Sequence, residues 1–143
     1  MFMGTFYNSI DAKNRMIIPS KHRDQLGGRC ILTEGMDNCL YIYPLSEFEK
    51  LYDKVSVMPQ TDKSVRRYMR DAFGNAQECE IDKQGRILIP AELKKRVHID
   101  KELVTTGAMN RIEIWGKEVW DDPDSYPVEE KENYLSELIK YGF

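Results

Sequence analysis

The chain has 143 residues, of which 41% are hydrophobic and 31% are charged. This length and composition predict a soluble globular protein that folds as one domain or as two small units sharing a core. The longest apolar runs are only a few residues, which excludes a membrane-spanning helix. No secretory leader opens the chain, so we expect a cytoplasmic protein.

Charge is unevenly distributed along the chain. The formal net charge is -3, yet residues 113–143 hold nine acids against three lysines. Residues 1–112 therefore hold 18 bases against 15 acids. A mildly basic body with an acidic C-terminal segment permits a nucleic-acid-binding surface.

The cysteines and histidines predict neither a disulfide framework nor a metal site. The three cysteines are odd in number and have no C-x-x-C spacing. His22 and His98 are isolated, so we expect each to be a surface or packing residue. No nucleophile–base pair and no Gly-rich phosphate loop is recognisable, which argues against an enzyme.

The first part of the chain predicts short strands and helices separated by turns. Residues 1–10 alternate as a half-buried strand does, and a polar turn separates them from a short apolar strand at 16–18, so we expect a hairpin. Pro19 suits the first turn of a helix over 19–26, which Gly27-Gly28 ends. The elements expected next are strands at 30–33 and 40–43 and an amphipathic helix at about 46–56 with a capping box of Ser46 and Glu49.

A helical connector, a second set of short elements and an acidic tail are predicted for the rest of the chain. Pro59-Gln60-Thr61 breaks the chain before a helix at 62–73 with an apolar stripe. The adjacent arginines Arg66, Arg67 and Arg70 are interpreted as a solvated face. The later predictions are a helix opened by Pro90, strands at 103–106 and 111–115, a turn-rich acidic stretch at 121–127, and a helix at about 128–141 carrying Tyr134, Leu135, Leu138 and Ile139.

A ten-residue motif occurs twice, and the chain is organised around it. Residues 10–19 read Ile-Asp-Ala-Lys-Asn-Arg-Met-Ile-Ile-Pro, and residues 81–90, at an offset of 71, read Ile-Asp-Lys-Gln-Gly-Arg-Ile-Leu-Ile-Pro. Such a fixed offset predicts two homologous units of roughly fifty residues. The register continues at an offset of 72, where Leu40, Ile42, Tyr43 and Phe48 align with Ile112, Ile114, Trp115 and Trp120. The aromatic residues of this set, with Tyr41, are interpreted as packing residues.

Each motif predicts a tight turn between its aspartate and its arginine. Asn14 and Gly85 occupy the same position in the two copies. Asn and Gly are the residue types that best tolerate a positive φ. We therefore expect a left-handed backbone at both positions.

The aspartate and arginine of each motif allow two interpretations. In one, the carboxylate accepts backbone N–H bonds or holds the guanidinium, and the pair is a structural clamp. In the other, the held arginine loses less rotamer entropy on binding, and its planar fork binds phosphate oxygens or the O6/N7 edge of guanine. Lys13 and Lys83 add positive charge to the same loops. Two such loops suit a repeated ligand such as double-stranded nucleic acid.

The whole chain resembles the MraZ family of bacterial transcription regulators. The resemblance rests on Met1-Phe2-Met3-Gly4, on both Asp-x-x-x-Arg motifs and on the segment Asn110-Arg111-Ile112-Glu113-Ile114-Trp115, and it covers at least residues 1–120. Each unit is also similar to the AbrB/SpoVT class of swapped-hairpin DNA-binding modules. Asn14 stands where glycine is common in the family, but asparagine adopts the same backbone conformation.

The resemblance implies an α+β fold in which two tandem β-rich swapped-hairpin repeats form an intramolecular pseudo-dimer with short peripheral helices. We therefore expect four segments along the chain. These are a first AbrB/SpoVT-like repeat at 1–58, a helical connector at 59–76, a second repeat at 77–120, and an acidic C-terminal helix at 121–143.

The resemblance also implies a function. Members of the family assemble into rings and bind short direct repeats in the promoter upstream of their own division and cell-wall gene cluster. We expect a cytoplasmic, nucleoid-associated homo-oligomer that binds double-stranded DNA, with no enzymatic activity, cofactor, metal, membrane partner or small-molecule substrate. Carried over to this sequence, the DNA-contacting arginines are Arg15 and Arg86 with Lys13 and Lys83 beside them, and Asp11 and Asp82 orient the arginines.

An antitoxin-like or protein-interaction module is the alternative. In that case the Asp-x-x-x-Arg pairs are structural. The acidic segment at 121–137 is the feature that would bind another protein.

Overall fold

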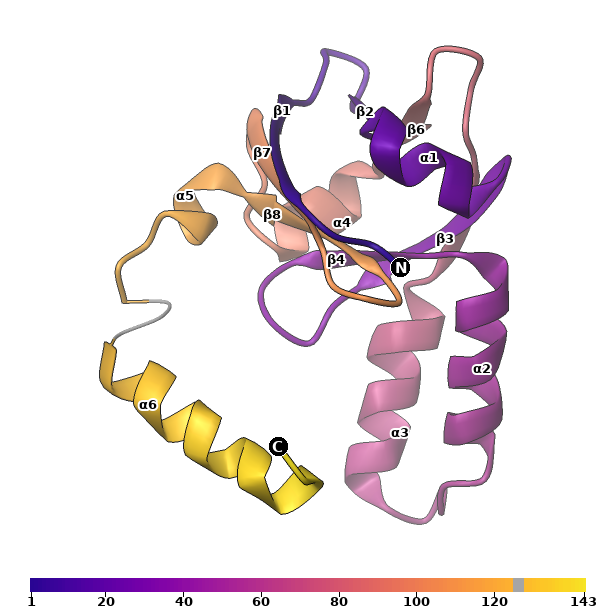
Figure 1. Ribbon diagram of the computed structural model, residues 1–143. Helices are drawn as coiled ribbons and strands as arrows, with labels where there is room; N and C mark the ends of the chain where they lie inside the picture. Colours follow the sequence, from indigo (N-terminus) through magenta and orange to yellow (C-terminus); the bar gives the residue numbers. More distant parts are fainter. Residues whose placement is uncertain (125–127) are drawn as a thin grey trace.

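The computed structural model describes residues 1–124 and 128–143. A six-stranded antiparallel sheet lies at the centre of the fold, in the order β1-β7-β8-β4-β3-β5 (Figure 1). A two-stranded ribbon, β2 (Arg15–Ile17) with β6 (Arg86–Leu88), stands apart from this sheet. The sheet strands are β1 (Thr5–Ser9), β3 (Arg29–Glu34), β4 (Leu40–Tyr43), β5 (Gln77–Glu80), β7 (Glu102–Gly107) and β8 (Ile112–Gly116).

Helices and strands together confirm the α+β class. The ribbon and two short helices cover one face of the sheet, and the remaining helices of the body lie on the other side (Figure 1). The first two are α1 (Ser20–Leu26) and α4 (Ala91–Arg96), and the others are α2 (Leu45–Ser56), α3 (Lys63–Met69), the π-helix η1 (Arg70–Gly74) and α5 (Lys117–Trp120). The chain ends in α6 (Val128–Glu137) and the 3₁₀-helix η2 (Leu138–Tyr141).

Strands of the two repeats are interleaved. β1 of the first repeat pairs with β7 of the second, and β5 of the second pairs with β3 of the first. The registers follow a pseudo-two-fold axis, because the equivalent residues Met16 and Ile87 lie opposite each other, as do Tyr41 and Glu113. The intramolecular pseudo-dimer of swapped hairpins is therefore confirmed.

Successive side chains of the central strands point to opposite faces of the sheet, so the fold has two hydrophobic clusters, one on each face. Leu40 and Ile42 of β4 join the large cluster beneath the ribbon, whereas Tyr41 and Tyr43 join the aromatic cluster beneath α2 and α5. All four side chains are buried, because both faces of β4 are covered. Ile112 and Ile114 of β8 likewise point inward, since both are buried in the large cluster.

The aromatic cluster repeats the sequence register in space. Tyr43 packs on Phe48 with ring centroids 5.8 Å apart, and the equivalent pair Trp115 and Trp120 has the same separation. These edge-to-face contacts confirm that the aromatic residues serve packing. His22 packs in the same manner between Phe2 and Phe6 on the opposite face of the sheet and is fully buried.

Two local expectations are wrong. β1 and β2 do not pair as a hairpin, because the backbone groups of β1 are bonded to β7 and those of β2 are bonded to β6. Asn8 Nδ2 instead donates a hydrogen bond of 3.2 Å to the carbonyl of Ile17. The capping box at Ser46 is also absent, because Pro44 precedes a helix that already begins at Leu45, so Ser46 lies inside the first turn.

The helices expected at 62–73 and at about 128–141 are also present. The helix expected at 62–73 is α3 with η1, and the three arginines on it are exposed, while Ala72 is the buried member of its apolar stripe. Within 128–143 the helix is present as α6 and η2, and Figure 1 shows it apart from the sheet. Part of the acidic stretch expected at 121–127 lies outside the described residues. No helix among the described residues is long and apolar enough to cross a membrane.

Gly107 allows the first residues of the chain to pack closely against the edge of β7. Its N–H donates to the carbonyl of Gly4 at 2.9 Å, and the Phe2 and Met109 backbones exchange two further hydrogen bonds. A Cβ placed on Gly107 would lie 2.4 Å from the backbone nitrogen of Met3. Because the clash is with backbone, no rotamer change relieves it.

We expect Gly107→Ala to lower the free energy of unfolding by about 1–3 kcal/mol, since the N-terminal segment must move away from β7. Urea denaturation followed by circular dichroism measures the change. Gly28→Ala is the matched control, because a Cβ on Gly28 would meet nothing within 4 Å. Equal unfolding midpoints for the two variants would contradict the argument.

Candidate nucleic-acid interface

Each motif forms a three-residue turn closed by its aspartate. The N–H of Asp11 donates to the carbonyl of Arg15 at 2.9 Å, and the N–H of Asn14 donates to the carbonyl of Asp11 at 3.0 Å. Asn14 has φ 61°, and its equivalent Gly85 has φ 78°, so the predicted left-handed conformation is confirmed at both. This pattern is a type I turn followed by a left-handed residue.

The aspartate carboxylate makes the same three contacts in both copies. In the first turn, Asp11 Oδ1 accepts the N–H groups of Lys13 and Arg15, each at 2.9 Å. Its Oδ2 accepts the Nε–H of the Arg15 guanidinium at 2.9 Å. In the second turn, Asp82 makes the equivalent bonds to the Gln84 N–H, the Arg86 N–H and Arg86 Nε, with the last at 2.8 Å.

These contacts keep the carboxylates ionised. The pKa of Asp11 is lowered first by the hydrogen bond from the Arg15 backbone N–H, and the bonds from the Lys13 N–H and the guanidinium lower it further. The pKa of Asp82 is lowered in the same way, first by the Arg86 backbone N–H. Hydrogen bonds to the charged form of a carboxyl favour that form.

The terminal nitrogens of the two guanidinium groups remain available to bind a ligand. Each aspartate contacts only the Nε of its arginine, and among the described residues neither terminal nitrogen of Arg15 or Arg86 has a hydrogen-bond partner. The side chains are 31% and 23% exposed, respectively. Each guanidinium is therefore fixed at its base, while two donor nitrogens can bind a ligand.

The solvent face of the ribbon carries more than the arginines. Arg15 lies opposite Leu88, and Ile17 lies opposite Arg86, so these four residues share one face. Met16 and Ile87, between them, point into the core and are 1% exposed. Ile17 is 53% and Leu88 is 57% exposed, so two large apolar side chains lie beside the arginines on this face. Because residues i and i+2 of a strand point to the same side, the sequence Arg15-Met16-Ile17 could have predicted that Arg15 and Ile17 share a face.

A cation from each repeat contacts the turn of the other repeat. Lys94 of α4 donates from Nζ to Asn14 Oδ1 at 2.9 Å. Its equivalent at the offset of 71 is Arg23 of α1, whose guanidinium lies over Gly85, where a Cβ would stand 2.1 Å from it. A side chain at position 85 would therefore displace the Arg23 guanidinium, and the φ of 78° separately favours glycine there. No local signal in the sequence indicates either contact, since each joins different repeats.

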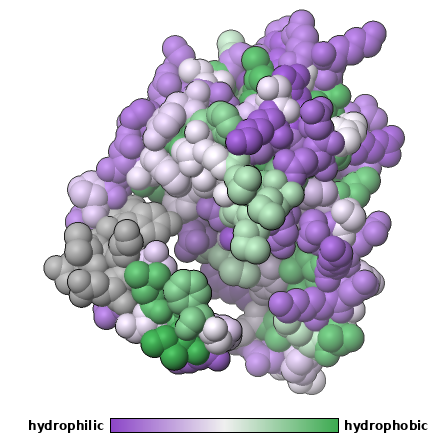
Figure 2. All heavy atoms as spheres, viewed as in Figure 1, coloured by the Kyte–Doolittle hydropathy of each residue, from purple (hydrophilic) through white to green (hydrophobic). Residues whose placement is uncertain are grey.

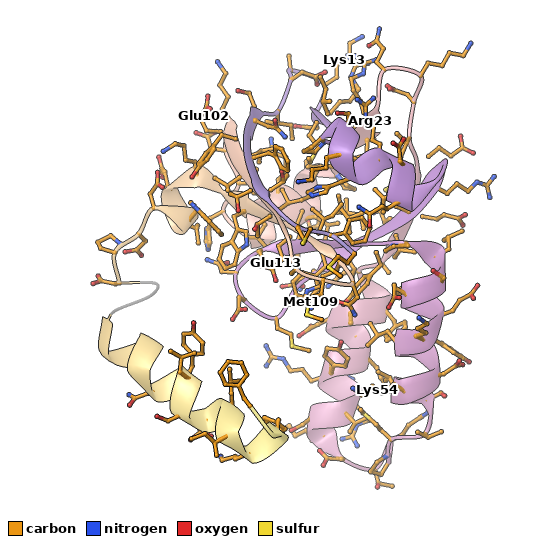
Figure 3. All side chains as sticks on the ribbon, viewed as in Figure 1. Lys13, Arg23, Lys54, Glu102, Met109 and Glu113 are labelled. Atoms are coloured by element: carbon orange, nitrogen blue, oxygen red, sulfur yellow. The ribbon has the colours of Figure 1, made fainter. Side chains whose placement is uncertain are left out.

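The two lysines predicted for the site are exposed but not equivalent. Lys13 aligns with Gln84, and Lys83 aligns with Ala12. Both turns project at the same end of the molecule, where Figure 3 labels Lys13 and Arg23 and Figure 2 shows mostly hydrophilic residues. Six cations thus gather around two aspartates, namely Lys13, Arg15, Arg23, Lys83, Arg86 and Lys94.

The three arginines of α3 and η1 do not belong to this interface. Arg66, Arg67 and Arg70 lie on α3 and η1, on the opposite side of the sheet from the ribbon (Figure 1). Arg66 donates to the carbonyls of Gln60 and Thr61, and Arg67 pairs with Asp71. In the part of the chain that the structure describes, no group of three or more His, Cys, Asp or Glu residues is placed to hold a metal ion.

Comparison with known proteins identifies the family. The family model described as "MraZ protein, putative antitoxin-like" matches residues 1–71 and again residues 72–138. The chain is 43% identical to a protein of Pediococcus pentosaceus over 99% of both chains. It is 48% identical to a protein of Thermoanaerobacter pseudethanolicus over 85% of both chains. It is 49% identical to a protein of Clostridium tetani over 85% of this chain and 86% of that one.

All three relatives are named "Transcriptional regulator MraZ". The two successive matches to the family model correspond to the two interleaved repeats of the fold. The chain therefore belongs to the MraZ family of transcriptional regulators.

Proposed function

We propose that the protein regulates transcription by binding double-stranded DNA through the β2–β6 ribbon and its two turns. The observation that carries this proposal is the pair of arginines, each held at Nε by an aspartate, with no hydrogen-bond partner for either terminal nitrogen among the described residues. The names of its relatives support the role of transcriptional regulator. The target proposed is a set of direct repeats in the promoter of its own division and cell-wall gene cluster.

The shape of the site suits the major groove. A two-stranded β-ribbon fits this groove, and an arginine fork binds O6 and N7 of guanine. The exposed Ile17 and Leu88 are suited to apolar contact with thymine methyl groups. Lys13 and Lys83, which are exposed in the turns, would contact phosphates.

One protomer supplies few contacts. If four cations of the ribbon and turns replace counterions, the logarithm of affinity falls against the logarithm of salt with a slope of about -3 to -4. Binding of several protomers, arranged in a ring, to tandem repeats would raise the affinity by factors on the order of 10² through effective concentration. This explains how a chain with a net charge of -3 can bind DNA.

The structural interpretation of the motif is the competing explanation. Asp11 Oδ1 closes the turn by accepting two backbone N–H groups whether or not the arginine binds a ligand. An experiment must therefore remove the guanidinium and leave this closure intact. Replacing the arginine by alanine does so, because the N–H of residue 15 or 86 remains.

We expect Arg15→Ala and Arg86→Ala each to weaken binding to a duplex from the protein's own upstream region by roughly 5- to 150-fold, the loss typical of an arginine–guanine contact. Fluorescence anisotropy at two salt concentrations measures affinity and salt slope together. The double variant should lose sequence preference and keep its fold and assembly.

Arg67→Ala is the matched control for this series. Arg67 also pairs with an aspartate four residues away, Asp71, but lies on α3. The affinity of the Arg67→Ala variant for the same duplex should match that of the wild type. If the double arginine variant binds as tightly as the wild type, the motifs are structural clamps, and the protein-interaction alternative takes precedence.

Lys94→Ala should weaken DNA binding more than Lys95→Ala does. Lys94 holds the side chain of Asn14, whereas its neighbour Lys95 is exposed. If Lys94 also reaches a phosphate, the salt slope should become shallower by about 1. The same anisotropy titration tests this, and equal affinities for the two lysine variants would refute a role for the contact between repeats.

The lowered pKa values of Asp11 and Asp82 predict turns that resist acid. The two ionised carboxylates stabilise the folded state fully when the pH is above the unfolded-state pKa of about 3.9. This stabilisation is lost as the pH falls through the folded-state pKa, which lies below 3.8. Carboxyl ¹³C shifts measured by NMR across pH 2–6, roughly the range that spans both values, should show this. In Arg15→Ala the pKa of Asp11 should stay below 3.8, since the backbone donors remain. A value at or above 3.8 in the wild type would contradict the observed contacts.

A further inference from the structure

Two of the three cysteines face each other across the junction of the repeats. Cys30 of β3 and Cys79 of β5 are directly opposite in the antiparallel register. Residues paired in this way have Cα atoms about 4.5–5.5 Å apart and point to the same face of the sheet. A disulfide needs a Cα separation of about 4.4–6.8 Å. Sequence spacing does not bring these residues together, but the strand register does.

The two cysteines of the pair differ in their burial. Cys30 is fully buried in the large core, whereas Cys79 packs at the rim of that core on β5, which is the last strand of the sheet. The two thiols lie close enough to shift each other's pKa, and Cys79 Sγ donates to the carbonyl of Gln77 at 3.7 Å. The third cysteine, Cys39, is buried in the aromatic cluster on the other face and has no cysteine opposite it.

We propose that Cys30 and Cys79 form a reversible intramolecular disulfide when the protein meets a peroxide or a disulfide oxidant. The bond would tie the first strand of the second repeat to the first repeat. Both cysteines are free thiols in this structure, so the structure represents the reduced form. Nothing in this proposal depends on the DNA-binding role of the ribbon.

The half-exposed Cys79 is the attacking thiol. The neighbouring Cys30 thiol lowers the pKa of Cys79, whereas the Cys79 thiol and burial raise the pKa of Cys30. With hydrogen peroxide, the Cys79 thiolate attacks one oxygen, the O–O bond breaks, and hydroxide leaves to take up a proton as water. Cys79 is then a sulfenic acid.

Cys30 completes the reaction. Its sulfur attacks the Cys79 sulfur, the S–S bond forms and the S–O bond breaks. The departing hydroxide takes the Cys30 proton and leaves as a second water. Two thiols have been oxidised by two electrons, and one peroxide has been reduced to two waters. A dithiol reductant reverses the change by thiol–disulfide exchange.

The bond would restrict the unfolded chain more than the folded one. It closes the segment from residue 30 to residue 79, which contains β4, both helices of the connector region and the start of the second repeat. A loop of this size predicts a rise in Tm on the order of 5–15 °C on oxidation. Because the cysteines are already opposite each other, the native sheet needs little adjustment.

Three measurements on the full-length chain test the proposal. After treatment with hydrogen peroxide and then removal of excess oxidant, thiols titrated in denaturant should fall from three to one. Non-reducing peptide mapping should find the Cys30 peptide joined to the Cys79 peptide within one molecule. Tm should rise, and dithiothreitol should restore the original value.

Matched variants separate this pair from other thiol chemistry. Cys39→Ala should still form the bond and show the increase in Tm, whereas Cys79→Ser should show neither. Retention of all three thiols in the folded wild type would overturn the proposal. So would a disulfide that joins only separate molecules, or one that includes Cys39.

Discussion

Pairing of β2 with β6 fixes where both arginine-bearing turns lie. Each strand has only three residues, and within the described chain each forms its ladder with the other. Met16 and Ile87 anchor the pair from below in the shared core. A ribbon this short is not stable alone in water. The positions of Arg15 and Arg86 relative to each other therefore depend on the whole interleaved core, and neither repeat could present its turn in this way by itself.

Local and periodic features of the fold could be predicted from the sequence. The repeat at 71 positions indicated two units, and the residue types at positions 14 and 85 indicated left-handed backbone, because these signals depend on neighbours in the chain. The resemblance to a family supplied the interleaving, which no periodicity shows. Gly27, which ends α1, follows the same local logic. The segment boundaries at residues 58, 76 and 120 stay predictions.

Contacts between the repeats could not be predicted. Lys94 with Asn14, Arg23 over Gly85, and Cys30 opposite Cys79 all join residues far apart in the chain, and only the interleaving of the two repeats brings them together. The capping box failed for a different reason, since Pro44 already fixes the backbone at the helix start and makes a side-chain cap unnecessary. The first failure is tertiary context overriding a local pattern, whereas in the second one local signal, Pro44, overrides another.

The departures from exact two-fold symmetry matter for the proposed target. A protein with identical halves reads a palindrome, because its symmetry is copied onto the DNA. Here Lys13 is equivalent to Gln84, Ala12 is equivalent to Lys83, and different cations lie beside the two left-handed residues. The two turns are therefore chemically unequal, and on the proposed function this would give a bound protomer a direction along the duplex. Direct repeats need this direction, since every copy has the same orientation, and a protomer with two unlike turns can bind each copy in the same sense.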